Sequence, residues 1–276
     1  MQVKYCCTHW GCEKDKPDIF VDKVLSAGYE GIEIFMPSTP NDFASLFIKE
    51  LEDVKRINPD FIFITQQLTV PDNDTVHDYI SRMEKSLYEL AALQPCFINS
   101  HTGKDYYSFD DNCRVIEAAL TISSKTGVRI LHETHRGRFS FHASSLIPYL
   151  KKFPELELVG DFSHFCTVSE SMLQDQAAII EEIIPHVSHL HARIGHEQAP
   201  QVNNPFAPEW EHHFAHFEEW WYRIIDYKKQ KGDKTFSITP EFGPAPYMPA
   251  LPFTRQPVGN QWEINRKMMD FLKSKL

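Results

Sequence analysis

The sequence predicts an α/β protein of the (β/α)8 TIM-barrel class, built as a single domain over residues 1–276. Short apolar segments typical of buried strands alternate about eight times with segments whose apolar residues recur every three or four positions, as on one helix face. Apolar residues make up 42% of the chain, enough for a large core, and no change of composition marks a domain boundary. Parallel strands covered by helices close into a barrel when about eight such units follow one another.

The first half of the chain contains four of the expected units. Strands are expected at residues 3–8, 31–35, 61–65 and 96–101. Helices are expected at residues 18–27, from an N-cap at Asn41 or Asp42 to about Ile57, at residues 76–90, and after an N-cap at Asp110. The third helix shows its pattern most clearly, because its apolar residues form one stripe.

The second half continues the alternation with longer connections. Strands are expected at residues 128–131, at a segment ending at Asp161, at a segment ending near His191 or Arg193, and at residues 235–241. Helices are expected around residues 177–184, at about 209–231, and from Gln261 onward. Residues 243–260 contain five prolines and fit neither pattern, which predicts a stiff irregular loop over the C-terminal mouth of the barrel.

Composition excludes several classes of protein. The formal net charge of −10 argues against nucleic-acid binding, which draws most of its affinity from clustered Lys and Arg. No run approaches 18 consecutive apolar residues, so no membrane span is expected, and the first strand begins too soon after Met1 for a signal peptide. The six cysteines form no C-x-x-C pair and are expected to be reduced. These features predict a cytoplasmic protein.

Titratable residues recur at the ends of the last four strands. Glu133, Asp161, His191 and Glu241 are separated by 28, 30 and 50 residues, and one βα unit of such a barrel takes about 30. The proline-containing connection before the aromatic helix accounts for the longer third interval. All four side chains are therefore expected at the C-terminal face, where the active sites of these barrels lie.

Three carboxylates brought together repel one another unless a positive charge compensates them. A divalent cation is the natural compensation. Oxygen ligands with one imidazole suit Mn²⁺, Mg²⁺ or Co²⁺, and Zn²⁺ also fits. The pattern therefore predicts one metal ion held by Glu133, Asp161, His191 and Glu241.

These strand ends resemble the xylose isomerase-like TIM barrel superfamily, in its sugar phosphate isomerase/epimerase branch. The resemblance extends from Thr8 to Gly243, nearly the whole chain. In the epimerase members a Glu, an Asp, a His and a second Glu hold one divalent metal, and the two glutamates are the acid/base pair on opposite faces of the substrate. The resemblance thus implies Glu133 and Glu241 as catalytic residues acting through a metal-stabilised enediolate.

The same resemblance implies contacts to the substrate. A histidine three residues after the Asp touches substrate in that family, and it matches His164. The arginine that epimerases place six residues after the metal histidine corresponds here to Glu197, so Arg193 is the expected anchor instead. Residues 191–195 and 240–244 resemble an uncharacterised subgroup, so the resemblance identifies the family and leaves the reaction open.

Other residues near the expected mouth are also candidates for substrate binding. His101 ends the fourth strand, and His135 and Arg136 follow Glu133 closely, where they could bind an oxyanion or a phosphate, or in the case of His135 support Glu133. Trp10 and Phe35 end the first two strands and could form pocket walls against the apolar face of a sugar, although packing alone would also explain them.

Four functions remain open at this point. The first is a metal-dependent isomerase or epimerase acting on a small sugar-like molecule. The second is a lyase of the inosose dehydratase type on the same site. The third, a nuclease like endonuclease IV, uses three zinc ions and a basic groove, which the charge and ligand set disfavour. The fourth is a binding barrel without catalysis. The aromatic helix at 209–231 could cover a partner subunit of a homo-oligomer or pack on its own barrel.

Overall fold

A closed parallel barrel forms the centre of the computed structural model, which describes residues 1–36, 41–68 and 75–276. Each strand pairs with the next in the sequence, and β8 pairs with β1 to close the ring. The strands are β1 (Gln2–Thr8), β2 (Gly31–Ile34), β3 (Ile62–Gln67), β4 (Phe97–Ser100), β5 (Ile130–Glu133), β6 (Leu158–Gly160), β7 (Val187–His191) and β8 (Thr235–Thr239). The fold class predicted from the sequence is confirmed.

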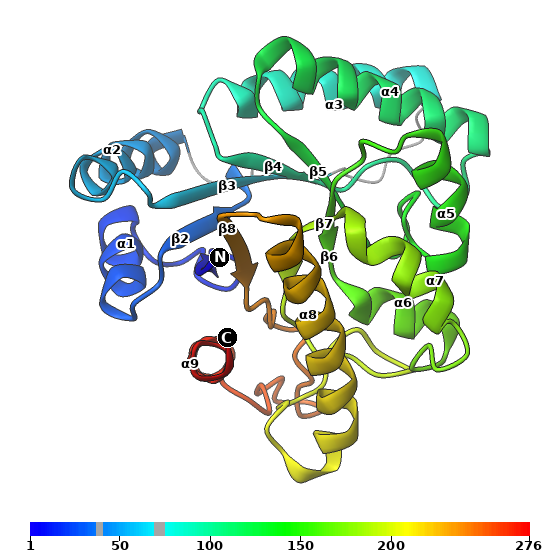
Figure 1. Cartoon of the computed structure of the whole chain (residues 1–276). Coiled ribbons are helices and arrows are strands. Elements are labelled where there is room, and N and C mark those ends of the chain that lie inside the picture. Colours follow the sequence, from blue (N-terminus) through cyan, green and yellow to red (C-terminus); the bar gives the residue numbers. More distant parts are fainter. Residues whose placement is uncertain (37–40, 69–74) are drawn as a thin grey trace.

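The helices form a ring around the strands, as Figure 1 shows. They are α1 (Pro17–Ser26), α2 (Asn41–Ile57), α3 (Val76–Ala91), α4 (Phe109–Thr126), α5 (Ala143–Lys152), α6 (Phe162–Ser169), α7 (Ala177–Ile183), α8 (Glu211–Lys231) and α9 (Gln261–Lys275). The side chain of Asn41, an expected N-cap, lies outside the described residues. No helix in the described ranges has the length and apolar character that crossing a membrane requires.

Side chains alternate between the two faces of each strand and thereby divide the core. One large apolar cluster lies between the strands and the helices. A second, small cluster consists of Cys6, Ile64, Phe97, Leu131 and Val159. Leu131 and Glu133 are two residues apart on β5 and so share a face, which places Glu133 directly above this apolar layer.

Several local features differ from the sequence-based expectation. Strand β5 extends to Glu133, so this glutamate ends the strand instead of starting the loop. Helix α4 is capped by Ser108, whose hydroxyl accepts a hydrogen bond from Asp111 N at 3.1 Å, and not by Asp110. Helix α6 was not expected at all. It begins directly after Asp161 because that carboxylate accepts the Ser163 N–H at 3.0 Å and caps the first turn.

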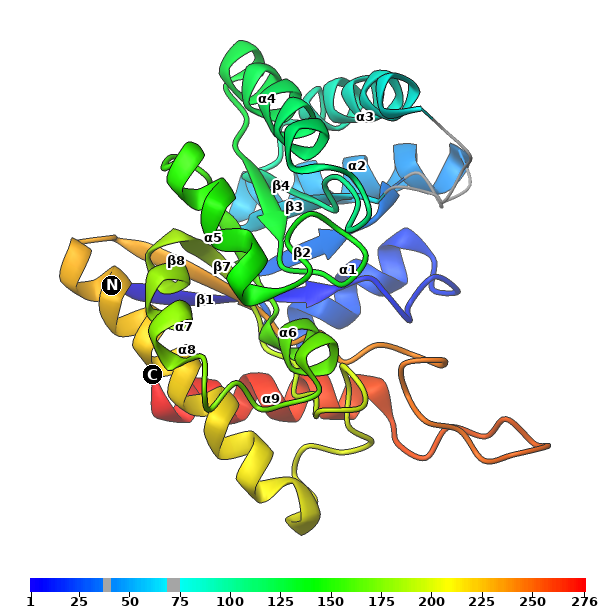
Figure 2. The ribbon, with the colours of Figure 1, turned by 90° about the vertical axis from the view of Figure 1, so that its right-hand side faces the viewer.

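The proline-rich loop at 243–260 lies partly over the mouth and partly away from it. Met248 is buried, and Tyr247 packs edge-on against Trp10 with ring centroids 5.0 Å apart. Farther along, an isolated bridge joins Ala250 and Pro257, and the chain between them carries the fully exposed Phe253. Figure 2 shows this part of the loop projecting away from the barrel. The loop therefore contributes its first residues to the mouth and exposes its tip.

Candidate active site

Four consecutive strands bring the expected ligands together. Glu133 is the last residue of β5, Asp161 follows β6, His191 ends β7 and Glu241 lies two residues beyond β8. Each offers one ligand atom, and these atoms all lie within 4.8 Å of one another. All four side chains are buried. The four residues that share this spacing in the sequence therefore form one cluster at the C-terminal end of the barrel.

The chemistry of this cluster fits a divalent cation. It combines three carboxylates with one imidazole, and buried carboxylates need compensating charge or hydrogen bonds. His191 Nδ1 lies 2.9 Å from Glu241 Oε2 and 3.8 Å from Glu133 Oε1. No group among the described residues makes an aligned hydrogen bond to this nitrogen. A histidine that binds a metal needs a ring nitrogen in such a position, buried and facing the carboxylates that would share the ion.

The surroundings shift the pKa values of the two glutamates, Glu133 and Glu241, in opposite directions. Burial would raise the pKa of Glu133, but His101 and His191 outweigh it and hold that pKa well below its usual range. Burial raises the pKa of Glu241, even though His191 and Arg193 oppose this. Two carboxyl groups at one site whose pKa values are pushed apart are suited to act as a base and an acid.

A cavity of about 290 Å³ opens beside the cluster, and its volume suits a small metabolite. Among the residues predicted from the sequence, those lining it are Trp10, Phe35, His101, Glu133, His135, Arg193 and Glu241. His9, Glu13, Gln66, Leu68 and Tyr247 complete the wall. Asp161, His164, His191 and Arg136 do not line it. The cavity thus reaches two of the four expected ligands directly.

Arg193 joins the ligand cluster to the cavity wall. Its guanidinium pairs with Asp161, lies 3.5 Å from Glu241 Oε2, and donates to His164 Nε2 at 2.9 Å. It also lies over the Tyr247 ring, 4.9 Å from the centroid. His164 is fully buried behind it. Arg193 is therefore placed to touch a substrate, whereas His164 contacts the arginine.

The histidines after β4 and β5 lie next to Glu133. His101 Nε2 is 3.0 Å from Glu133 Oε2, and the His101 and His135 rings are 4.4 Å apart. His135 Nδ1 donates to the Arg136 carbonyl at 2.6 Å, and burial together with His101 holds the pKa of His135 well below its usual range. The Arg136 guanidinium lies over Tyr247, 5.1 Å from the ring centroid. His135 therefore faces the cavity as a neutral ring.

Several polar residues of the site were not identified from the sequence. Glu33 on β2 is fully buried and makes hydrogen bonds to β3, β4, β7 and β8. The sequence does contain a signal for Glu33, because this charged residue stands in the middle of an otherwise apolar strand. Tyr247 lies in a proline-rich loop without periodicity, so no pattern could place it over the mouth. His189, two residues before His191 on β7, is also buried, and its two nitrogens bond Ser237 and Thr239.

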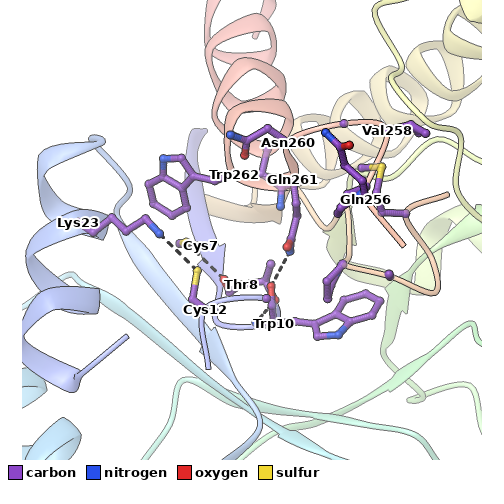
Figure 3. Close-up of a pocket in the computed structure, with 17 residues that line it drawn as sticks. Cys7, Thr8, Trp10, Cys12, Lys23, Gln256, Val258, Asn260, Gln261 and Trp262 are labelled. Carbon is purple, nitrogen blue, oxygen red and sulfur yellow. Dashed lines mark hydrogen bonds between the residues drawn. The ribbon is translucent and has the colours of Figure 1, made fainter. Parts of the chain in front are cut away.

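A second, larger cavity of about 640 Å³ lies beside the first and is drawn in Figure 3. It is lined by the end of β1 and the chain after it, by the 243–260 loop, by the first residues of α9 and by Lys23 of α1. Trp10 lines both cavities. The Lys23 ammonium is already engaged, 3.2 Å from Asp15 and 4.1 Å from the centroid of Trp262. None of the four expected ligands lines this larger cavity.

Comparison with known proteins supports the fold. No protein-family model matches the sequence, and no curated protein matches it either. Among solved structures, the probable 3-DHS dehydratase AsbF from Bacillus anthracis superposes with a TM-score of 0.64 at 16% identity, covering 99% of this chain and 100% of that one. A xylose isomerase-like TIM barrel protein from Mycobacterium smegmatis in complex with magnesium gives 0.61 at 8% identity, covering 98% and 97%. The IolI protein with a zinc atom gives 0.60 at 12%, covering 99% and 98%.

The architecture and these matches together define a parallel eight-stranded α/β barrel. Within that class, the fold of this chain is the one seen in xylose isomerase-like TIM barrel proteins. Two of the similar structures carry a zinc or a magnesium ion, and this chain has a candidate group of metal ligands.

Proposed function

We propose that this protein is a single-domain, divalent-metal-dependent isomerase or epimerase of a small sugar or sugar derivative. The observation that carries this proposal is the buried group of Glu133, Asp161, His191 and Glu241, whose ligand atoms lie within 4.8 Å of one another beside a cavity of about 290 Å³. Mn²⁺, Mg²⁺, Co²⁺ and Zn²⁺ all suit this set of ligands.

The two glutamates take different roles in the proposed reaction. A cation held by the four side chains would supply a Lewis acid for the substrate carbonyl and for the negative charge that develops beside it. Glu133, whose pKa is lowered, is ionised at neutral pH and accepts the proton from the carbon next to that carbonyl. We assign Glu241, whose pKa burial raises, as the carboxyl group on the other side of the substrate that returns a proton to carbon.

The cavity walls position the substrate for these proton transfers. Arg193 presents its guanidinium next to Glu241 and can bind a substrate oxygen. Trp10 and Phe35 offer apolar surface to the carbon face of a sugar ring and exclude water. His101 donates from Nε2 to Glu133 and keeps that carboxylate oriented.

A lyase reaction of the dehydratase type is the second candidate, because one protein of similar fold is named a probable 3-DHS dehydratase. Isomerisation, epimerisation and dehydration all begin with loss of a proton next to a carbonyl. The same residues could serve each of them, and only the product distinguishes them.

Metal content is the first measurement that tests the proposal. Purified protein should contain, or take up, one divalent ion per chain, as measured by elemental analysis. Ketoses, inososes and their phosphates are then incubated in D2O with and without chelator, and NMR follows deuterium incorporation and dehydrated products. Metal-dependent deuterium incorporation into one of these compounds is the expected result. A protein that binds no divalent metal contradicts the proposal.

Two variants test the proton-transfer roles on any substrate so found. Glu133→Gln and Glu241→Gln should each lower kcat by about 10²–10⁴-fold, the usual contribution of a general acid or base. Circular dichroism and thermal unfolding verify that both variants fold. Near-wild-type turnover in either one removes that glutamate from the mechanism.

A further inference from the structure

Glu33 is a buried carboxylate at the centre of a hydrogen-bond network inside the barrel. It accepts hydrogen bonds from Thr239 Oγ1 at 2.7 Å, from Gln66 Nε2 at 3.0 Å and from Asn99 Nδ2 at 3.0 Å. None of its surface reaches solvent. Because burying a carboxylate is costly unless its oxygens are hydrogen-bonded, so complete a set of donors indicates a specific role.

The fourth donor to Glu33 is His191, one of the proposed metal ligands. His191 Nε2 lies 3.1 Å from both carboxylate oxygens. An ionised carboxylate only accepts hydrogen bonds, so Nε2 must carry the hydrogen. The other ring nitrogen, Nδ1, is thereby directed at Glu241 and Glu133.

Asn99 extends the same network to a second proposed ligand. Its Nδ2 group donates to Glu33 at 3.0 Å and to Glu133 Oε2 at 2.8 Å, so one amide links the two carboxylates. The residues involved come from β2, β4, β5 and β7. The position of Glu133 is therefore tied to that of Glu33 through a single side chain.

We propose that Glu33 is a positioning residue of the metal site. It holds the His191 ring with Nε2–H toward itself and Nδ1 toward the metal, so that Nδ1 is the ligand atom. The inference rests on the metal site of the proposed function and adds a residue to it. A carboxylate behind a ligating histidine fixes the tautomer and the ring orientation and makes the ligand more basic.

The hydrogen bonds favour this arrangement over a second metal site at Glu33. Ligand atoms of Glu33, His189 and His191 also lie within 4.8 Å of one another. However, both ring nitrogens of His189 are hydrogen-bonded, Nδ1 to Ser237 at 2.7 Å and Nε2 to Thr239 at 2.9 Å. The Glu33 carboxylate already accepts hydrogen bonds from four donors. These groups satisfy each other without an ion.

Calorimetric titration of the full-length, metal-free protein with Mn²⁺ tests the proposal. Glu33→Gln should bind Mn²⁺ about 10–100-fold more weakly than the wild type, as is usual when the partner of a ligating histidine is lost. Glu157→Gln is the matched control, because it also removes one carboxylate but stands before β6, at the opposite end of the barrel. Its Mn²⁺ affinity should equal that of the wild type.

A measurement on the wild type decides the question even if Glu33→Gln does not fold. In the Zn²⁺-loaded protein with ¹⁵N-labelled histidine, long-range ¹H–¹⁵N correlation spectra should show His191 ligated through Nδ1 and protonated at Nε2. Ligation through Nε2 overturns the proposal, and so does unchanged Mn²⁺ affinity in a folded Glu33→Gln. Wild-type protein that binds neither Mn²⁺ nor Zn²⁺ overturns the proposed function as a whole, so the two failures are distinguishable.

Discussion

Arg193 shows how much a single buried charge matters in this protein. It is 1% exposed and neutralises Asp161. In metal-free protein, Arg193→Met leaves that carboxylate without its partner, so the free energy of unfolding should fall by about 3–5 kcal/mol. Urea unfolding in the presence of a chelator measures this loss.

An arginine at the surface is the control for this prediction. Arg129 pairs with Glu157, but about half of its side chain is exposed. Arg129→Met should cost no more than about 1 kcal/mol, because solvent screens exposed pairs. Equal losses in the two variants would show that Arg193 is not a buried partner of Asp161.

Trp10 and Gly243 form a contact that allows no additional atom. A Cβ on Gly243 would lie 2.1 Å from Trp10 Cη2. Gly243→Ala should therefore displace the indole from the cavity wall and lower the free energy of unfolding by about 1–3 kcal/mol, the usual cost of overpacking. The double variant with Trp10→Ala is the control, because removing the indole should abolish the cost. An unchanged cost in the Trp10→Ala background would place its origin elsewhere.

At the residue scale, site residues could be predicted from the sequence where their position along a strand was decisive. Glu133, Asp161, His191 and Glu241 stand out in the sequence as titratable residues at the ends of expected strands, spaced by about the length of a βα unit, and the structure brings them together. Their role as ligands stays a prediction. Glu33 was missed because its partners lie on β3, β4, β7 and β8, and contacts so distant in sequence leave no local pattern.

At the scale of elements, the N-cap of α4 offers a direct test. The Ser108 hydroxyl accepts the Asp111 N–H, so Ser108→Ala should lower the free energy of unfolding by about 1 kcal/mol. Asp110→Ala, at the position expected from the sequence, removes no cap and should stay within about 0.5 kcal/mol. Chemical denaturation of both variants ranks the two positions. A larger loss for Asp110→Ala would reassign the cap.

Glu157 links β5, β6 and β7 at the N-terminal end of the barrel. It makes a contribution to the free energy of unfolding that depends on pH. Burial would raise its pKa, but hydrogen bonds and charge from Arg129, with a further bond from Ser188, lower it. Because the pKa of Glu157 is lower in the folded state, its ionised form stabilises the fold. This stabilisation is fully present at pH values above the pKa of the unfolded state, about 4.3, and it is lost as the pH falls through the pKa of the folded state.

Replacing Glu157 should therefore flatten the acid side of the stability curve. Between pH 7 and pH 3 the urea midpoint of Glu157→Gln should fall less than that of the wild type. The two proteins should converge at the acid end, where the wild-type carboxyl group is protonated as well. Parallel curves over this range would mean that Glu157 is not preferentially ionised in the folded state.

Sequence patterns predicted best the helices with a clear stripe of apolar residues on one face and the strands that consist of an apolar run. Helix α3 matches the expected residues almost to the end, because its periodicity reports its buried face. Helix α6 was missed because it is only eight residues long and mostly buried, so it shows no contrast between polar and apolar faces. Its start depends on the cap at Asp161, which from the sequence read as a strand end.

For the whole molecule, the proposed ligands come from only one half of the barrel. They stand at the ends of β5, β6, β7 and β8, whereas none comes from β1 to β4. Metal binding should therefore slow amide hydrogen exchange more in β5–β8 than in β1–β4. Exchange measured by mass spectrometry with and without Mn²⁺ provides the comparison, and His191→Ala provides a control that should show no change. Uniform protection of all strands would argue for a site shared around the barrel.

The barrel itself follows from regularity that extends over the whole sequence. Eight alternations of strand and helix leave few ways to pair parallel strands, and right-handed connections leave one. The irregular connections were harder to predict. The loop at 243–260 supplies Tyr247 to the cavity and exposes Phe253, and neither outcome follows from local composition.

Asp161 has two independent tasks, and this has an evolutionary consequence. One oxygen caps α6 through the Ser163 N–H, while the other pairs with Arg193 beside the proposed metal. Selection for a stable fold and selection for chemistry would therefore both retain an aspartate here. A related chain that had lost its metal could still keep this residue. Persistence of His191 and Glu241 would be the better record of a working site.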